Sequence, residues 1–174
     1  MTIHKILWLF RQYAHHLASV RKPGFALFDD QGQRIGHVDA LIWRQDQIAV
    51  SGWVMADRVV LVNGTRRTPA RSGIERSDVA AALPDLTDAR VGFEVRAPHI
   101  PAPALLCIER PEGRYLHPLP GIAAGEVRRA RRAQAGPFLG RLLSLVPAGV
   151  RWKLGGDETA RDEVLRGLGL LEDR

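Results

Sequence analysis

The stretch QIAVSGWVMADRVVLVNG, Gln47–Gly64, holds two runs of residues that alternate as β-strands do. In the first run the even-numbered residues from 48 to 54 share one face of a strand, and Trp53 points to the other face. Gly52 therefore removes bulk from one face directly before Trp53 fills the opposite one. The second run ends at Asn63-Gly64, a dipeptide that tolerates the positive φ angles of a two-residue hairpin turn. The stretch predicts two adjacent antiparallel strands.

Short alternating runs separated by turn residues extend from Phe25 to about Pro118. Asp29-Asp30, which precede a glutamine and a glycine, are typical of a tight turn rather than of a metal or acid/base pair. The short segment RSDVAAALPDL predicts a helical turn that Ser77 or Asp78 caps and that Pro84 ends. Seven or eight short strands with such connections favour a mainly β fold, an antiparallel β-sandwich of the immunoglobulin-like or jelly-roll-like kind.

Helices are predicted at both ends of the chain. Residues 1–22 form an amphipathic helix whose apolar face we expect to pack on the β-sandwich of residues 23–120. Residues 121–174 form a helical extension in three parts. Phe138, Leu139, Leu142, Leu143, Leu145 and Val146 are expected to form one apolar face, and Asp157 is expected to cap the last helix.

Composition sets broad limits on function. The 174 residues carry a formal net charge of +6, which permits attraction to nucleic acid, acidic lipid or acidic polysaccharide. No run of about 20 apolar residues is present, so no membrane-spanning segment is predicted. The single cysteine, Cys107, lies in an apolar run and is expected to be a buried strand residue, which weakly favours the cytoplasm.

Motifs for catalysis, metals and cofactors are weak. His15 and His16 are adjacent, so on a helix their side chains diverge and cannot hold one metal ion. The other histidines, His37, His99 and His117, lack partner ligands at metal-binding spacing, and KLGGD lacks the spacing of a phosphate-binding loop. We therefore expect a protein that is not an enzyme and that uses no metal or cofactor.

Four short motifs in a fixed order suggest a family. SGWVMAD, VVLVNG, RSDVAAALPD and VGFEV, within Val38–Glu109, resemble the β-sandwich accessory segment attached to some bacterial, notably alphaproteobacterial, glycosyltransferases of the inverting family-two type. The resemblance implies a non-catalytic accessory or stand-alone module in surface-polysaccharide synthesis, with a glycosyltransferase chain or a glycan as partner. It transfers no catalytic residues, because no catalytic domain or aspartate-x-aspartate metal motif follows. Its matching residues here are Gly52, Trp53, Asn63, Gly64, Arg76, Asp78, Val79, Gly92 and Phe93.

Two functional surfaces are proposed from the sequence. Trp53, with Trp43 and Arg76, is a candidate glycan-binding platform, although packing of one sheet is the favoured explanation of the glycine-tryptophan pair. The second surface is a candidate for anionic membranes at the inner face of the cytoplasmic membrane, and its residues are Arg128, Arg129, Arg131, Arg132, Arg151, Trp152 and Lys153. A solvated helix face is the ordinary alternative, and nucleic acid is disfavoured because no recognition module accompanies the arginines.

A structural or interaction protein is the rival class. The sequence feature that favours this class is the pair Trp8 and Leu9 in the first helix. We expect both side chains to be exposed and the helix to dock on a partner protein. The oligomeric state and the ligand do not follow from the sequence.

Overall fold

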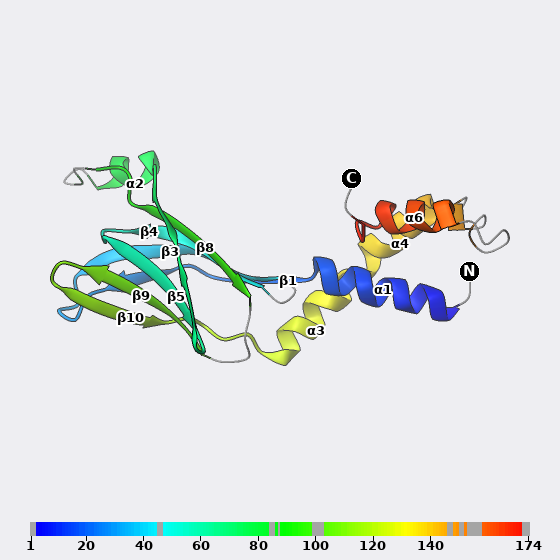
Figure 1. The fold of residues 1–174 in the computed structure, drawn as a ribbon, viewed down its shortest axis with the longest axis horizontal. Coiled ribbons are helices and arrows are strands. Elements are labelled where there is room, and N and C mark those ends of the chain that lie inside the picture. Colours follow the sequence, from blue (N-terminus) through cyan, green and yellow to red (C-terminus); the bar gives the residue numbers. More distant parts are fainter. Residues whose placement is uncertain are drawn as a thin grey trace. The chain divides into compact units, whose positions relative to one another are not determined.

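A computed structural model describes residues 3–44, 47–83, 86, 88–98, 103–145, 148–149, 152 and 158–171 (Figure 1). The chain divides into two compact units. One, the β-unit, is Val20–Ile122, and the other, the helical unit, combines Met1–Ser19 with Ala123–Arg174. The predicted boundaries at residues 22 and 120 lie close to these limits, but the two ends of the chain form one unit rather than two separate additions.

The β-unit consists of two antiparallel sheets (Figure 1). Sheet A has the order β1-β3-β4-β8-β7, and β2 also pairs with β3. Sheet B has the order β10-β9-β5-β6. The strands of sheet A are β1 (Ser19–Lys22), β2 (Phe25–Phe28), β3 (Arg34–Arg44), β4 (Gln47–Val54), β7 (Arg71–Ile74) and β8 (Gly92–Pro98). Those of sheet B are β5 (Arg58–Asn63), β6 (Arg66–Pro69), β9 (Ala104–Arg110) and β10 (Gly113–Pro118).

One hydrophobic core joins the two sheets. Its buried residues come from β2, β3, β4 and β8 of sheet A and from β5 and β9 of sheet B. Between β6 and β7 only Ala70 intervenes, so the chain passes from one sheet to the other there, and the Ala70 amide donates to the Val59 carbonyl (2.8 Å). The alternation of the strands explains this core, because each sheet turns one set of alternate side chains inward.

The predicted strands are confirmed, and two further strands were missed. β1 and β7 are short and rich in polar residues, so neither shows the period-two pattern of a half-buried strand. The hairpin turn after β5 lies one residue later than predicted. Asn63 is a buried strand residue that pairs with Arg66 and donates from its amide to the Pro98 carbonyl (3.1 Å), and Gly64, with φ 61°, begins the turn.

Two local predictions about turns have different outcomes. Asp29 does form a tight turn, because its carboxylate accepts hydrogen bonds from the amides of Gln31 (3.0 Å) and Gln33 (2.8 Å). The predicted cap of the short helix α2 (Ser77–Ala82) is wrong, because Arg76 takes the cap position and its side chain makes no capping hydrogen bond to the helix backbone. Pro84 lies outside the described residues.

The helical unit has its own core. It contains α1 (Ile3–Leu17), α3 (Ala124–Ala133), α4 (Ala135–Ser144) and α6 (Glu158–Gly167). Leu9 and Tyr13 of α1 are buried in one cluster with Phe138 of α4 and with Val164 and Leu168 near the end of the chain. The expectation that α1 packs on the β-domain is therefore wrong, since its buried side chains belong to the helical core. The predicted cap Asp157 lies outside the described residues.

The apolar residues of α4 do not share one face. Phe138 is buried and lies against Phe10 and Tyr13, with ring centroids 5.3 and 5.4 Å apart. Leu139 and Leu143 are 53% and 71% exposed. The predicted apolar face was too wide, because residues one position apart on a helix differ in direction by about 100°. Val146 lies outside the described residues.

Candidate functional site

Both tryptophans of the predicted glycan platform are buried. Trp43 is 5% exposed and belongs to the core between the sheets, while Trp53 is 7% exposed and belongs to neither core cluster. The Arg34 guanidinium lies 5.3 Å from the centre of the Trp53 ring. Because Trp43 pairs with the core residue Ile48 and Trp53 alternates with Val54, the two rings lie on opposite faces of sheet A. The predicted aromatic platform is therefore wrong.

The glycine-aromatic pairs of β4 and β8 pack against each other reciprocally. In the register of these strands Gly52 faces Phe93 and Trp53 faces Gly92. Each large ring thus has a glycine as its direct cross-strand neighbour, with Phe93 on the core face and Trp53 on the outer face. Gly52 and Trp53 are thus half of a four-residue arrangement with Gly92 and Phe93, which supports the packing explanation of the glycine-tryptophan pair.

Gly52 also permits a β-bulge in the neighbouring strand. The register of β3 with β4 runs from Val38 opposite Gly52 to Ala40 opposite Ser51, so Asp39 is an extra residue. A Cβ atom on Gly52 would clash with the His37 carbonyl oxygen and lie 2.9 Å from the Val38 Cα. The close approach of β3 therefore requires glycine at this position, and the bulge redirects the Asp39 side chain.

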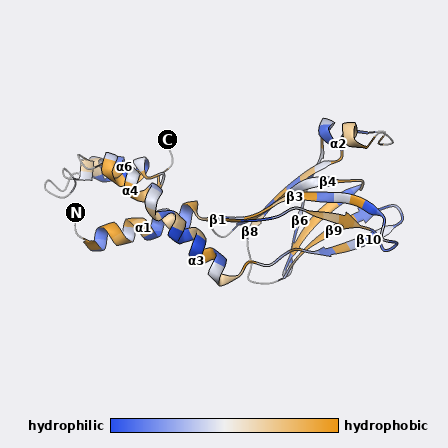
Figure 2. Ribbon diagram, turned by 180° about the vertical axis from the view of Figure 1, so that it is seen from behind, coloured by the Kyte–Doolittle hydropathy of each residue, from blue (hydrophilic) through white to orange (hydrophobic). Residues whose placement is uncertain are grey.

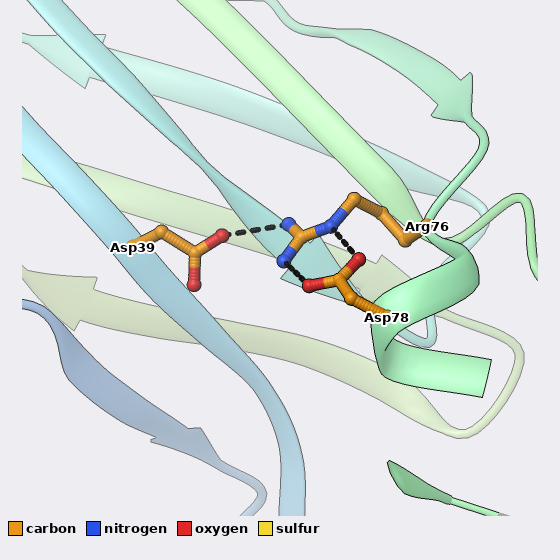
Figure 3. A network of polar contacts seen from close by, with 3 residues as sticks. All are labelled: Asp39, Arg76 and Asp78. Atoms are coloured by element: carbon orange, nitrogen blue, oxygen red, sulfur yellow. Dashed lines mark hydrogen bonds and ion pairs between the residues drawn. The ribbon is translucent and has the colours of Figure 1, made fainter. Parts of the chain in front are cut away.

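Asp39, Arg76 and Asp78 form a charged group that we call the Arg76 cluster (Figure 3). Arg76 donates from Nε and Nη2 to the two carboxylate oxygens of Asp78, both at 2.8 Å, and from Nη1 to Asp39 at 2.6 Å. Its aliphatic stem runs over Gly92, where an added Cβ would lie 2.9 Å from the Arg76 Cγ. The cluster therefore joins the start of α2 to the bulge of β3.

Arg76 and Asp78 both remain charged throughout the neutral range. Hydrogen bonds from Arg76 lower the pKa of Asp78 to about 2, and the bond to Asp78, with that to Asp39, raises the pKa of Arg76. Arg76 thus has both carboxylate partners within the chain, and three of its five N–H groups are used. This arrangement indicates a structural role first, in holding α2 against sheet A. The sequence missed Asp39, whose only signal is a lone acidic residue inside an alternating strand.

Replacing Arg76 with lysine should destabilise the β-unit by about 1–2 kcal/mol, because lysine cannot make the forked contact with Asp78 and reach Asp39. Urea unfolding followed by circular dichroism measures this difference. Arg71→Lys is the matched control, since the Arg71 guanidinium makes one contact of 3.5 Å with Glu94 and is largely exposed. That control should change the unfolding free energy by less than about 0.5 kcal/mol. Equal effects of the two variants would contradict the structural role of the cluster.

A shallow pocket lies on the outer face of sheet A. Its volume is about 120 Å³, and small side chains of β3 and β4 line it together with two charged residues of β8. Outer-face positions are identified by their cross-strand pairing, Ala40 with Ser51 and Ala49 with Arg96. The side chains on this face that line the pocket are Ala40, Ile42, Ala49, Ser51, Glu94 and Arg96.

His117 is a half-buried titratable group on β10, an edge strand of sheet B. It pairs with the core residue Leu106, and its buried Nε2 has no hydrogen-bond partner among the described residues. Burial lowers the pKa of His117, against a smaller opposing effect of a hydrogen bond with the Phe28 backbone. The folded state therefore binds this proton less readily than the unfolded state, whose histidine pKa is about 6.5.

Acid should consequently destabilise the β-unit through His117. Since the unfolded state binds more protons, the free energy of unfolding falls as the pH drops below about 6.5. In His117→Phe the unpartnered nitrogen and its titration are both removed, so we expect a smaller loss of stability between about pH 7.5 and pH 5. Urea midpoints of both proteins across this range provide the measurement. Parallel pH profiles would exclude His117 as the source.

Four arginines of the helical unit lie on one exposed helix, α3. α3 buries none of its residues and contains Arg128, Arg129, Arg131 and Arg132, and its arginine-rich part is blue in Figure 2. Arg131 also contacts His15 of α1, with 3.0 Å between Nη2 and Nδ1. These four candidates are therefore gathered on one exposed helix, as the sequence predicted.

The other three basic-surface candidates have a different outcome. Trp152 is half-buried and packs against the helical core, with the Lys5 ammonium 4.5 Å from its ring centre. Packing in the helical core therefore accounts for the buried part of Trp152. Arg151 and Lys153 lie outside the described residues.

Exposed apolar side chains concentrate in the helical unit. Six of the nine large ones among the described residues belong to it, namely Ile3, Leu7, Trp8, Leu139, Leu143 and Leu171. Trp8 is exposed as predicted, but Leu9 is fully buried. A set of exposed apolar residues beside a basic helix is typical of a surface that meets another molecule.

Known proteins do not identify the chain. It matches no protein-family model, curated protein or solved structure. In the part of the chain that the structure describes, no helix has the length and apolar character that crossing a membrane requires. The same residues contain no group of three or more His, Cys, Asp or Glu side chains placed to hold a metal ion. Cys107 is buried, as predicted.

Proposed function

We propose that the protein is a non-catalytic accessory module that binds an anionic surface through its helical unit. The observation that carries this proposal is α3, a helix of ten residues that buries none of them and carries four arginines. Arginine is weakly hydrated for a cation and binds phosphates in a forked geometry, so such a helix attracts phosphate-bearing surfaces. The anionic surface that we propose is the cytoplasmic face of the inner membrane.

Co-sedimentation with lipid vesicles tests this function. The unchanged protein should sediment with vesicles that contain acidic phospholipid at low salt, and binding should weaken as salt is added. Vesicles of zwitterionic lipid alone should bind much less. Failure to sediment with acidic vesicles at low salt would refute the proposal.

The β-unit is proposed to serve surface-polysaccharide synthesis beside a glycosyltransferase chain. The support is the resemblance of its motifs, together with two sheets on one core, which agree with a β-sandwich of the immunoglobulin-like or jelly-roll-like type. A glycan ligand, if the β-unit has one, could not stack on Trp43 or Trp53, since both tryptophans are buried. Tryptophan fluorescence during titration with the host's surface polysaccharide tests this part separately.

A protein partner is the second candidate function. Trp8 is 50% exposed and lies next to Leu7, which is itself one turn from Ile3, and both of these residues are also exposed. Tryptophan is enriched at the centres of protein interfaces. Trp8→Asp should then abolish association measured by analytical ultracentrifugation, while leaving vesicle binding through α3 intact.

A further inference from the structure

Exposed residues of α3 are followed along the chain by exposed residues of α4, with Gln134 (φ −76°, ψ −6°) between the two helices and the Phe138 amide donating to its carbonyl (2.9 Å). Arg128 and Arg132, four residues apart, share one face of α3. Gly136, Leu139 and Leu143, in steps of three and four residues, share one face of α4. We call these five residues the α3–α4 stripe.

The stripe changes in character along its length. Its first part consists of exposed arginines. Its second part has no charged side chain, because Leu139 and Leu143 stand with Gly136. A Cβ atom added to Gly136 or Gly140 would lie more than 4 Å from every described heavy atom beyond its own stretch of helix. The charged residue of α4, Arg141, instead lies over the Tyr13 ring, 5.8 Å from its centre. The stripe is thus basic at one end and apolar and open at the other.

We infer that the α3–α4 stripe binds a lipid bilayer and that Leu139 and Leu143 insert among its acyl chains. This inference rests on the proposed function, and it adds which side chains enter the membrane and how deep they reach. The arginine part complements acidic headgroups, and the uncharged part suits the acyl region just below them. A polyanion without an apolar layer would use the arginines and leave the leucines in water.

Leu139→Ser with Leu143→Ser tests the insertion. Each leucine that leaves water strengthens binding by about tenfold, so the double variant should bind acidic vesicles about a hundredfold more weakly. Its binding should keep the salt dependence of the unchanged protein, because the arginines remain. The matched control is Leu83→Ser with Leu116→Ser, two exposed leucines of the β-unit, which should bind as the unchanged protein does.

An environment-sensitive fluorophore gives a second, direct readout. The label is attached to Leu143→Cys in the full chain, and Cys107 is fully buried and protected from labelling in the folded protein. Acidic vesicles should shift its emission to the blue, and spin-labelled acyl chains should quench it. The same label at Thr65→Cys, an exposed hairpin residue of the β-unit, should not respond.

The outcomes separate this inference from the proposed function. If the unchanged protein does not bind acidic vesicles, the proposed function fails and the inference fails with it. If binding is salt-dependent but the double leucine variant binds equally well and the Leu143 label is unchanged, the function stands and the insertion is refuted. A label that shifts without lipid, increasingly with protein concentration, would assign the stripe to a second copy of the chain and overturn the inference.

Discussion

Replacing Gly52 with alanine should destabilise the β-unit by about 3 kcal/mol or more, the upper end of what overpacking a core costs. The added Cβ meets backbone rather than a movable side chain, since the His37 carbonyl and the Val38 Cα lie in its place. β3 would have to move away from β4, and that movement would disturb the bulge at Asp39 and its bond to Arg76. Chemical unfolding followed by circular dichroism measures the loss.

Gly113→Ala is the control for this prediction. Gly113 also lies in a strand, β10, but its nearest neighbours would be Tyr115 atoms at 3.7 Å or more, an ordinary contact distance. This variant should be within about 0.5 kcal/mol of the unchanged protein, as is usual for surface positions. If both glycines tolerate alanine equally, the close approach of β3 and β4 is not what Gly52 provides.

Replacing all four arginines of α3 with serine should weaken binding to acidic vesicles several hundredfold. A basic residue near an acidic membrane surface contributes roughly fivefold in affinity, and the four residues act together. Because α3 buries none of its residues, the change should leave the unfolding transition of the β-unit in place. Co-sedimentation at several salt concentrations measures the loss, and the variant should also lose most of its salt dependence.

A variant with the same change in net charge separates local from overall electrostatics. In this control variant, four exposed arginines of the β-unit are replaced with serine, namely Arg66, Arg67, Arg90 and Arg96. If general positive charge drives binding, the affinity of this control for acidic vesicles should fall as far as that of the α3 variant. We expect it to keep most of the affinity, because the proposed contact with the acidic headgroups is made by the arginines of α3.

Local patterns predicted the fold of the β-unit well. Alternation and turn residues found the strands of the core, and Asp29 formed its turn as expected, because these features depend on neighbours in sequence. β1 and β7 were not predicted because each contains a single large apolar residue, Val20 or Ile74, which is too few to show an alternation in the sequence. The packing of α1 was misjudged, since an amphipathic face states that a partner exists but not which one.

The candidate sites depended on facts that alternation cannot supply. A strand pattern shows that Trp53 and Val54 face opposite ways, but the burial of the Trp53 ring depends on the chain around it, including Arg34. The bulge at Asp39 becomes visible only when the register of β3 and β4 is known. The arginines of α3 were predictable, because a local charge run on an exposed helix needs no tertiary information.

Amide hydrogen exchange of the full-length protein, with and without acidic vesicles, tests most directly that the helical unit is the binding surface. The account predicts slower exchange within α3 and α4, residues 124–144, and unchanged exchange in β3, β4 and β8. Slower exchange confined to the strands of sheet A, with α3 and α4 unaffected, would contradict it and assign the surface to the β-unit.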